Sequence, residues 1–136
     1  MADKVTFELV SPERLLLATE ADMVVVPGQE GDFGVLSGHQ PVISMLRPGA
    51  VDIYEGERLV ERIFVAGGFA EVSSDRLTVL VEEATAQKDV DQAALPRRIA
   101  ELRERIEEAG EDEMLRQSLE ARLAYLELMG ESGQPH

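Results

Sequence analysis

Val5-Thr6-Phe7-Glu8-Leu9-Val10 is the first regular stretch of this 136-residue chain. Within it the apolar side chains of Val5, Phe7 and Leu9 alternate with polar ones. Successive side chains of a β-strand point to opposite faces of the sheet. The alternation therefore predicts a strand with one buried face and one face in water.

Further short runs of apolar residues follow along the first two thirds of the chain. They are Asp22 to Val26, Val42 to Leu46, Val51 to Tyr54, Leu59 to Val65, Phe69 to Val72 and Leu77 to Val81. The breaks between them hold turn residues, such as Pro27-Gly28, Pro48-Gly49 and Gly67-Gly68, which is the spacing of strands. Because no helical segment lies between the runs, an antiparallel sandwich or flattened barrel is favoured over a βαβ fold.

The hydrophobic period changes near Ala84, from that of strands to that of helices. The apolar residues that recur at steps of three and four are first Ile99, Leu102, Ile106 and Ala109, and then Leu115, Leu119, Leu123 and Leu126. Gly110 between the two series can end one helix, and Asp112 can cap the next. We therefore expect a β-sandwich domain over residues 1–86 and an antiparallel helical hairpin over residues 87–136.

The ends of the hairpin are also predicted. Asp91 is a candidate first cap, but Pro96 breaks an established helix, so regular helix should start at Pro96 or bend there. The tail from Gly130 to His136 is expected to fray. A hairpin of this size buries too little surface to fold alone, so its apolar stripes must dock on the sandwich, on a partner, or on each in turn.

Composition excludes several classes of function. The net charge of −14 repels phosphate backbones and anionic lipid headgroups, which argues against nucleic acid and against direct binding to a membrane surface. The chain has no cysteine, and its start lacks the layout of a signal peptide, so we expect a protein that is cytosolic or faces the cytosol on a membrane complex.

No catalytic or metal-binding constellation stands out. Asp32-Phe33-Gly34 matches the kinase magnesium triplet in letters only, since the other kinase motifs are missing. Of the two histidines, His136 is terminal and His39 lies in a Gly-His-Gln-Pro turn, so His39 is expected to hold its loop together with Gly38 and Pro41. The arginines of the hairpin either pair with glutamates on a solvated face or grip a phosphate between the helices.

Four motifs in order carry a resemblance to a known family. They are Gly31-Asp32-Phe33-Gly34-Val35-Leu36-Ser37-Gly38-His39-Gln40-Pro41-Val42-Ile43-Ser44, then Leu46-Arg47-Pro48-Gly49, Gly67-Gly68-Phe69-Ala70-Glu71-Val72 and Leu77-Thr78-Val79-Leu80. The chain resembles the epsilon subunit of bacterial F-type ATP synthases, whose mitochondrial counterpart is called delta. Members of that family show Gly-Glu-Phe-Gly followed by Pro-Gly-His-x-Pro-Leu, and they end in a helical hairpin after an Asp-x-Asp segment, here Asp89-Val90-Asp91.

The resemblance implies a β-sandwich of about ten antiparallel strands, followed by the hairpin, at the foot of the rotating central stalk. It implies that the sandwich packs on the gamma subunit and stands on the ring of c subunits, at the cytoplasmic face of the bacterial inner membrane. In the family the loop that matches Glu30, Gly31 and Asp32 meets the basic loops of the c ring. An ordinary acidic turn is the alternative for that loop.

The resemblance also implies a movable hairpin. Family hairpins dock on the sandwich or extend along gamma to the alpha and beta catalytic subunits, where they restrain ATP hydrolysis. Members that sense ATP carry Asp-x-x-Arg-Ala and second-helix arginines; here Asp91 and Arg122 match, but Ala94-Leu95 and Leu126 depart from the pattern. We therefore expect no cofactor. An isolated nucleotide-binding regulator and an unrelated β-sandwich adaptor are the competing functions.

Overall fold

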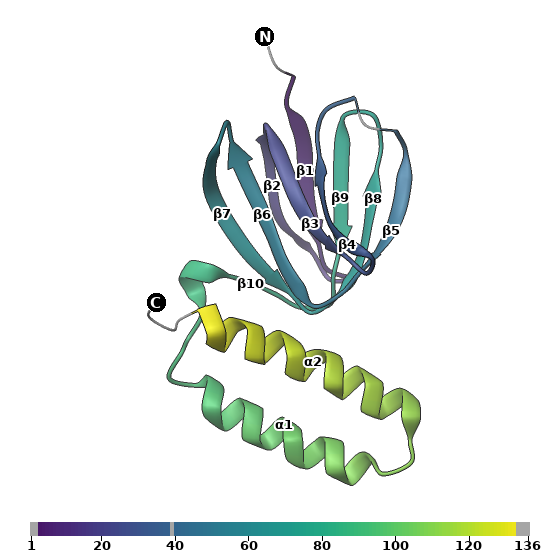
Figure 1. Ribbon diagram of the computed structural model, residues 1–136, viewed down its shortest axis with the longest axis vertical. Helices are drawn as coiled ribbons and strands as arrows, with labels where there is room; N and C mark the ends of the chain where they lie inside the picture. The colour runs from purple at the N-terminus through teal and green to yellow at the C-terminus, as the bar shows by residue number, and fades with distance from the viewer. Residues whose placement is uncertain (1–2, 39, 133–136) are drawn as a thin grey trace.

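Two layers of strands lie above a pair of helices in the computed structural model, which describes residues 3–38 and 40–132 (Figure 1). The first layer contains β2 (Leu15–Ala21), β1 (Val5–Val10), β9 (Arg76–Leu80), β8 (Gly68–Val72) and β5 (Val42–Leu46). The second contains β4 (Gly31–Val35), β3 (Met23–Gly28), β6 (Gly49–Glu55), β7 (Arg58–Val65) and β10 (Ala84–Ala86). Gly28 pairs with Leu46 and joins the layers into one ten-stranded sheet.

The predicted β-sandwich is confirmed, with one difference in strand direction. The strand pairs are antiparallel apart from β1 and β9, which are parallel with Phe7 opposite Leu77. Three strands had no separate run in the sequence prediction: β2, β4 and β10. Two of them, β4 and β10, are short, and β4 contains two glycines, so neither shows the apolar alternation that identifies a strand.

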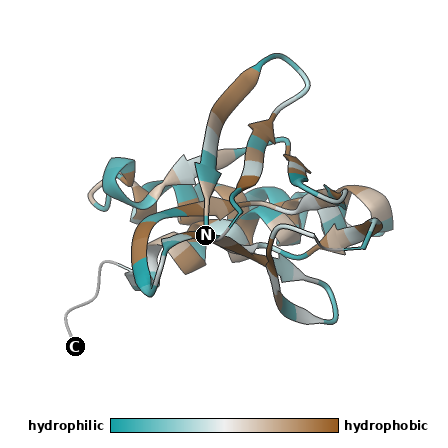
Figure 2. Ribbon diagram, turned by 90° about the horizontal axis from the view of Figure 1, so that it is seen from above, coloured by the Kyte–Doolittle hydropathy of each residue, from teal (hydrophilic) through white to brown (hydrophobic). Residues whose placement is uncertain are grey.

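The main core fills the space between the two layers. Buried and less buried residues alternate along strands such as β1 and β6, hydrophobic stretches are visible along the strands in Figure 2, and the inward-facing members of both layers form one buried cluster. It consists of Val5, Phe7, Leu9, Ala21, Val24, Val26, Val35, Leu46, Val51, Ile53, Ile63, Val65, Ala70, Val72, Leu77, Val79 and Val81. The sandwich is thus held by valine and leucine, which offsets the scarcity of aromatic residues in the sequence.

Gly68 shows why the Gly67-Gly68 pair is needed at the start of β8. Its φ is +135°, and a Cβ on it would lie 2.1 Å from the carbonyl oxygen of Leu80. No side chain fits that space, so glycine lets β8 pass close to the end of β9.

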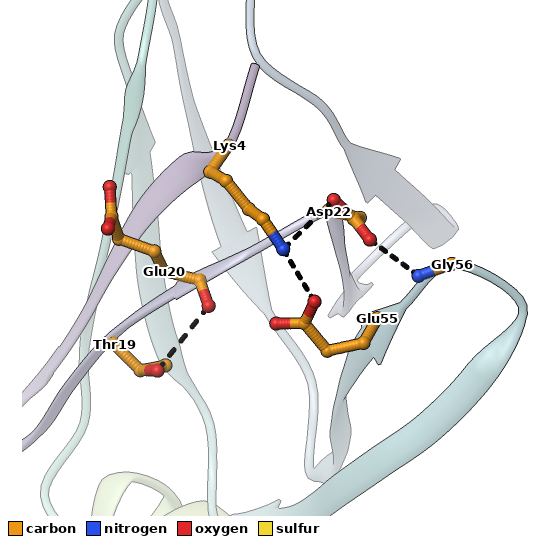
Figure 3. Close-up of polar contacts among 6 residues, drawn as sticks. All are labelled: Lys4, Thr19, Glu20, Asp22, Glu55 and Gly56. Carbon is orange, nitrogen blue, oxygen red and sulfur yellow. Dashed lines mark hydrogen bonds and ion pairs between the residues drawn. The ribbon is translucent and has the colours of Figure 1, made fainter. Parts of the chain in front are cut away.

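A polar cluster closes the end of the sandwich farthest from the helices (Figure 3). Lys4 forms ion pairs with Glu55 at 2.5 Å and with Asp22 at 3.2 Å, and the backbone N–H of Gly56 donates to Asp22. Hydrogen bonds to Glu55 and then Asp22 raise the pKa of Lys4. The Gly56 N–H, followed by Lys4, lowers the pKa of the Asp22 carboxyl. The cluster joins the start of β1 to the turn between β6 and β7.

The hairpin consists of α1 (Leu95–Ala109) and α2 (Glu113–Ser132), after a short 3-10 turn at Gln87–Asp89. Pro96 lies in the first turn of α1, as predicted, and Gly110 has the positive φ that ends it. Asp112 accepts a hydrogen bond from the Leu115 N–H at 3.2 Å and so caps α2. The prediction of a frayed tail from Gly130 was wrong for its first residues, because α2 continues through Ser132 and packs against α1 there.

A second core holds the hairpin against the sandwich. Phe64 of β7 points away from the main core and is only 2% exposed, because Tyr125, Leu126 and Met129 of α2 cover it together with their neighbours. Leu95, Leu102 and Leu119 complete the buried part of this cluster. The helix next to the sandwich is α2, and α1 packs on the far side of α2 (Figure 1).

Candidate functional site

The turn between β3 and β4 carries the first set of predicted site residues. Gly28 pairs with Gly31 across the turn, and Glu30 at its tip is exposed. Arg47, the residue after β5, binds the turn: its guanidinium donates to the Gly28 carbonyl and pairs with Asp32 at 2.5 Å. Asp32 is therefore paired within the chain, although 58% of its side chain is exposed, whereas no cation of the described residues pairs with Glu30. Both carboxylates are accessible on this turn, and Glu30 is the one without an ion-pair partner among the described residues.

Backbone contacts hold this turn in place. The N–H of Gln29 donates to the Met45 carbonyl, and the N–H of Arg47 donates to the Pro27 carbonyl, both at 3.0 Å. The turn is thus fixed at Gln29 to the end of β5 and at Pro27 to the residue after it, and these bonds support its acidic tip. Sequence reasoning identified the acidic residues but did not find Arg47, because a pairing across 15 residues leaves no local pattern.

The loop between β4 and β5 carries the residues predicted to be structural. Gly38 has a φ of +84°, which favours glycine, and its N–H donates to the Ser74 carbonyl in the turn between β8 and β9. Pro41 is exposed just before β5, and His39 lies outside the described residues. The contact at Gly38 agrees with a loop-holding role for this position.

The outer face of the first layer carries an apolar row that sequence reasoning missed. The strand register places Met45 beside Phe69, Phe69 beside Leu80, Leu80 beside Val10 and Val10 beside Leu15. Met45 is 56% exposed and Leu15 is 53% exposed, at the two ends of the row, and Ile43 one step along β5 is 68% exposed. We call these six residues the outer apolar row. Phe69 is 36% exposed, and Leu80 and Val10 between the ends are partly buried. Exposed apolar patches are more common at interaction sites than elsewhere on a surface, so the row is a candidate for one.

The only local signal for this row lies in β5, whose sequence has apolar residues on both of its faces. A half-buried strand is expected to carry polar residues on its solvent-facing side, yet Ile43 and Met45 lie on that side of β5. The other members come from four different strands. Their alignment depends on register, which no single segment of the sequence contains.

The predicted nucleotide residues Asp91 and Arg122 have separate structural partners. The Asp91 carboxylate accepts a hydrogen bond from the Ala94 N–H at 3.3 Å and so closes the turn before α1. Arg122 pairs with Glu83 at 2.9 Å. Arg122 lines a recess of about 550 Å³ between α2 and the sandwich, and Asp91 is not among the described residues that line it. The structure does not bring these two residues together in one recess.

The positions that depart from the ATP-sensing pattern belong to the packing of the hairpin. Leu126 is 2% exposed and lies in the second core, and Leu95 is 3% exposed in the same cluster. Ala94 precedes the first turn of α1. An arginine in place of Leu126 would have to bury its charge or move the helix.

The hairpin arginines mostly pair with glutamates, as expected for a solvated helical face, and not as a cluster that grips a phosphate. The pairs are Arg97 with Glu101, Arg98 with Glu83, Arg103 with Glu127, Arg116 with Glu113 and Arg122 with Glu83. Four of these five arginine side chains are more than 45% exposed, so each pair contributes little to stability on its own.

Comparison with known proteins adds a family to this geometry. The model of the ATP synthase delta/epsilon chain, β-sandwich domain, matches residues 4–87. The ATP synthase epsilon chain of Rhodospirillum centenum is 54% identical over 128 residues, which cover 90% of this chain and 87% of that one. The epsilon chain of Maricaulis maris is 48% identical over 129 residues, covering 95% and 96% of the two chains.

Two solved structures share the fold. A chain in the Euglena gracilis mitochondrial ATP synthase, in a structure of its OSCP, F1 and c-ring, superposes with a TM-score of 0.76 at 23% identity and covers 98% of this chain and 84% of that chain. A chain in the central stalk and c-ring of the Tetrahymena thermophila mitochondrial ATP synthase gives a TM-score of 0.59 at 13% identity, with 98% of each chain covered.

Proposed function

This chain belongs to the delta/epsilon family of ATP synthase chains, and from that premise we propose how each of its surfaces serves the rotor of the enzyme. It is an epsilon-type subunit, part of the stalk and not of the catalytic machinery. The observation that carries this function is the likeness to epsilon chains along almost the whole chain. In this role it transmits rotation of the c ring through gamma to ATP synthesis.

The physical properties of the sandwich suit that task. Transmission of torque requires a body that does not deform, and one hydrogen-bonded sheet of ten strands around a close-packed core provides it. Residues 1–86 would form this body, and residues 87–136 would form a separable hairpin. None of the described helices is long and apolar enough to span a membrane, so attachment to the inner membrane, at its cytoplasmic face, would come through the complex.

Gamma is the partner that fits the outer apolar row. The row lies on the outer face of the first layer, and the hairpin covers the outer face of the second layer at Phe64. Phe69 and Leu80 of the row also line the recess beside α2, so the row borders the docked hairpin. A permanent interface needs an apolar centre, and the centre of this row, from Phe69 to Val10, carries no charge. The row therefore offers gamma the broad contact that a rotor requires.

The c ring fits the turn that carries Glu30. Its exposed carboxylate has the sign that complements a basic loop, and Arg47 holds the turn rigid. The turn also lies at the end of β3 opposite to the polar cluster of Lys4, since Met23 at the other end pairs with Tyr54. One end of the sandwich would thus face the ring.

The hairpin would act by changing its partner. In the structure it is docked, with Tyr125, Leu126 and Met129 buried near Phe64. In an extended state these residues would be exposed, so the stripe would need a new apolar partner along gamma and the alpha and beta subunits. A hairpin held there would restrain ATP hydrolysis.

Replacement of Met45 by Asp should weaken the contact with gamma at least tenfold. Burial of a methionine side chain contributes about 1.5–3 kcal/mol, and about 1.4 kcal/mol corresponds to a factor of ten in affinity. The chain, tagged and purified from native membranes, should bring gamma and the catalytic subunits with it, and M45D should bring much less gamma by mass spectrometry.

Val60→Asp is the matched control, because Val60 is 41% exposed on β7 of the other layer. It should leave the amount of gamma unchanged. Absence of gamma from the wild-type preparation would contradict the stalk function and favour a free regulator or an adaptor. Equal recovery of gamma with M45D would contradict the placement of the interface alone.

Cysteines at Glu30 and in the polar loop of the c subunit should form a disulfide under mild oxidation. The chain has no cysteine of its own, so the product would be unambiguous. A cysteine at Glu57, in the turn at the opposite end of the sandwich, should give no product. The placement is wrong if Glu30→Cys fails with every position of the c loop in an enzyme that remains coupled.

MgATP should bind the isolated chain weakly or not at all. Each charge-assisted hydrogen bond contributes roughly 1.5–3 kcal/mol, and the family arginines are absent at Ala94 and Leu126. Their loss should weaken affinity on the order of a hundredfold. Titration calorimetry measures this directly, and a dissociation constant in the low micromolar range or below would show that other residues rebuild the site.

A further inference from the structure

Among the described residues, Glu83 is the one carboxylate of the sandwich domain that pairs with both helices of the hairpin. It lies just before β10, and its side chain is 27% exposed. Its Oε1 pairs with the Arg122 guanidinium of α2 at 2.9 Å, and its Oε2 lies 3.5 Å from the guanidinium of Arg98 on α1. One carboxylate of the sandwich domain thus forms ion pairs with both helices.

A partly buried hydrogen bond lies beside this charge. The hydroxyl of Tyr125, whose side chain is fully buried, is 2.6 Å from the hydroxyl of Thr85, two residues after Glu83. Burial raises the pKa of the Tyr125 hydroxyl, so this group remains a neutral hydrogen-bonding partner at neutral pH. The segment from Glu83 to Thr85 thus supplies the polar half of the docking contact, and Phe64 supplies the apolar half.

Removal of Glu83 would do more than remove two surface ion pairs. Arg98 and Arg122, which both pair with Glu83, would then lie near each other without the anion between them, and their positive charges would repel. Removal of one arginine would leave the other still paired. Among the charges at this contact, Glu83 is therefore the one on which docking depends most.

We propose that the Glu83 carboxylate is an internal anion that holds the hairpin on the sandwich, so that docking in this chain needs no bound phosphate ligand. The recess of about 550 Å³ beside α2 is lined by Glu83 and Arg122 together with Arg105. A phosphate anion that entered it would have to displace Glu83 from Arg122. The regulatory meaning of docking rests on the proposed function, whereas the contact itself belongs to the isolated chain.

Thiol labelling measures docking directly in the isolated full chain. A Leu126→Cys substitution places the only thiol in the second core, where Leu126 is 2% exposed, so the thiol reacts when the hairpin leaves the sandwich. In that background Glu83→Gln should increase the labelling rate roughly three- to tenfold, the range expected for loss of one or two ion pairs. Glu82→Gln, which removes the same charge one residue earlier from an exposed side chain, should leave the rate unchanged.

Inorganic pyrophosphate tests whether Glu83 occupies the place of a ligand. At millimolar concentration it should not change the labelling rate of the chain that keeps Glu83. It should slow the labelling of the Glu83→Gln variant, because it binds the two arginines that have lost their partner. The double substitution Arg98→Gln with Arg122→Gln should also label faster than the chain with Glu83 and both arginines intact, but less so than Glu83→Gln, because it removes the two ion pairs without leaving two arginines that repel. It should not respond to pyrophosphate. This variant leaves the sandwich unaltered, so it keeps the test valid if Glu83→Gln does not fold.

Three results would overturn the proposal. In the first, Glu83→Gln and the double variant label no faster than the Leu126→Cys chain that keeps Glu83. In the second, Glu82→Gln increases the labelling rate as much as Glu83→Gln does. In the third, pyrophosphate changes the labelling rate equally with and without Glu83. None of them depends on gamma. If the labelling results contradict the proposal but gamma is recovered normally from membranes, the internal anion is rejected and the stalk function is not. If labelling agrees with the proposal but gamma is not recovered, the stalk function is rejected and the internal anion is not.

Discussion

Burial of β7 on both of its faces is the constraint on which the arrangement of the molecule depends. Ile63 and Val65 point into the main core, and Phe64 between them points the other way, into the core beneath the hairpin. A strand in a two-layered sandwich normally has one face in water. Phe64 is an aromatic side chain on that outer face, so something must cover it, and α2 does so with Tyr125 and its neighbours.

The two cores differ in size and in the contacts that close them. The main core is closed by strand pairings between distant segments, including the parallel contact of β1 with β9, and it fixes the outer apolar row and the Glu30 turn as parts of one rigid body. The second core is small, and on the sandwich side its buried member is Phe64. Because this contact is small, the hairpin is expected to separate from the sandwich at a lower free energy than the sandwich needs to unfold.

The sequence predicted those elements whose signal is local. The strands Val5–Val10 and Val42–Leu46 were predicted with their observed bounds. The two helices were predicted with Pro96 in the first turn of α1 and Gly110 at its end. The strand β2 was missed because Leu15, Leu16 and Leu17 are consecutive and show no alternation. The partners of Asp32 and Arg122 were missed because they lie 15 and 39 residues away. The outer apolar row could not be predicted because it exists only once five strands are in register.

Separation of the sandwich from the hairpin is the central claim, and a chain that ends at Lys88 tests it most directly. Urea unfolding of residues 1–88, followed by circular dichroism, should show one cooperative transition, and calorimetry with purified gamma should give an affinity within a few-fold of that of the full chain. The loss of the hairpin exposes Phe64, so some loss of solubility is expected without loss of the fold. A non-cooperative transition, or a fragment that folds but no longer binds gamma, would contradict the division into a rigid body that assembles and a hairpin that is free to leave it.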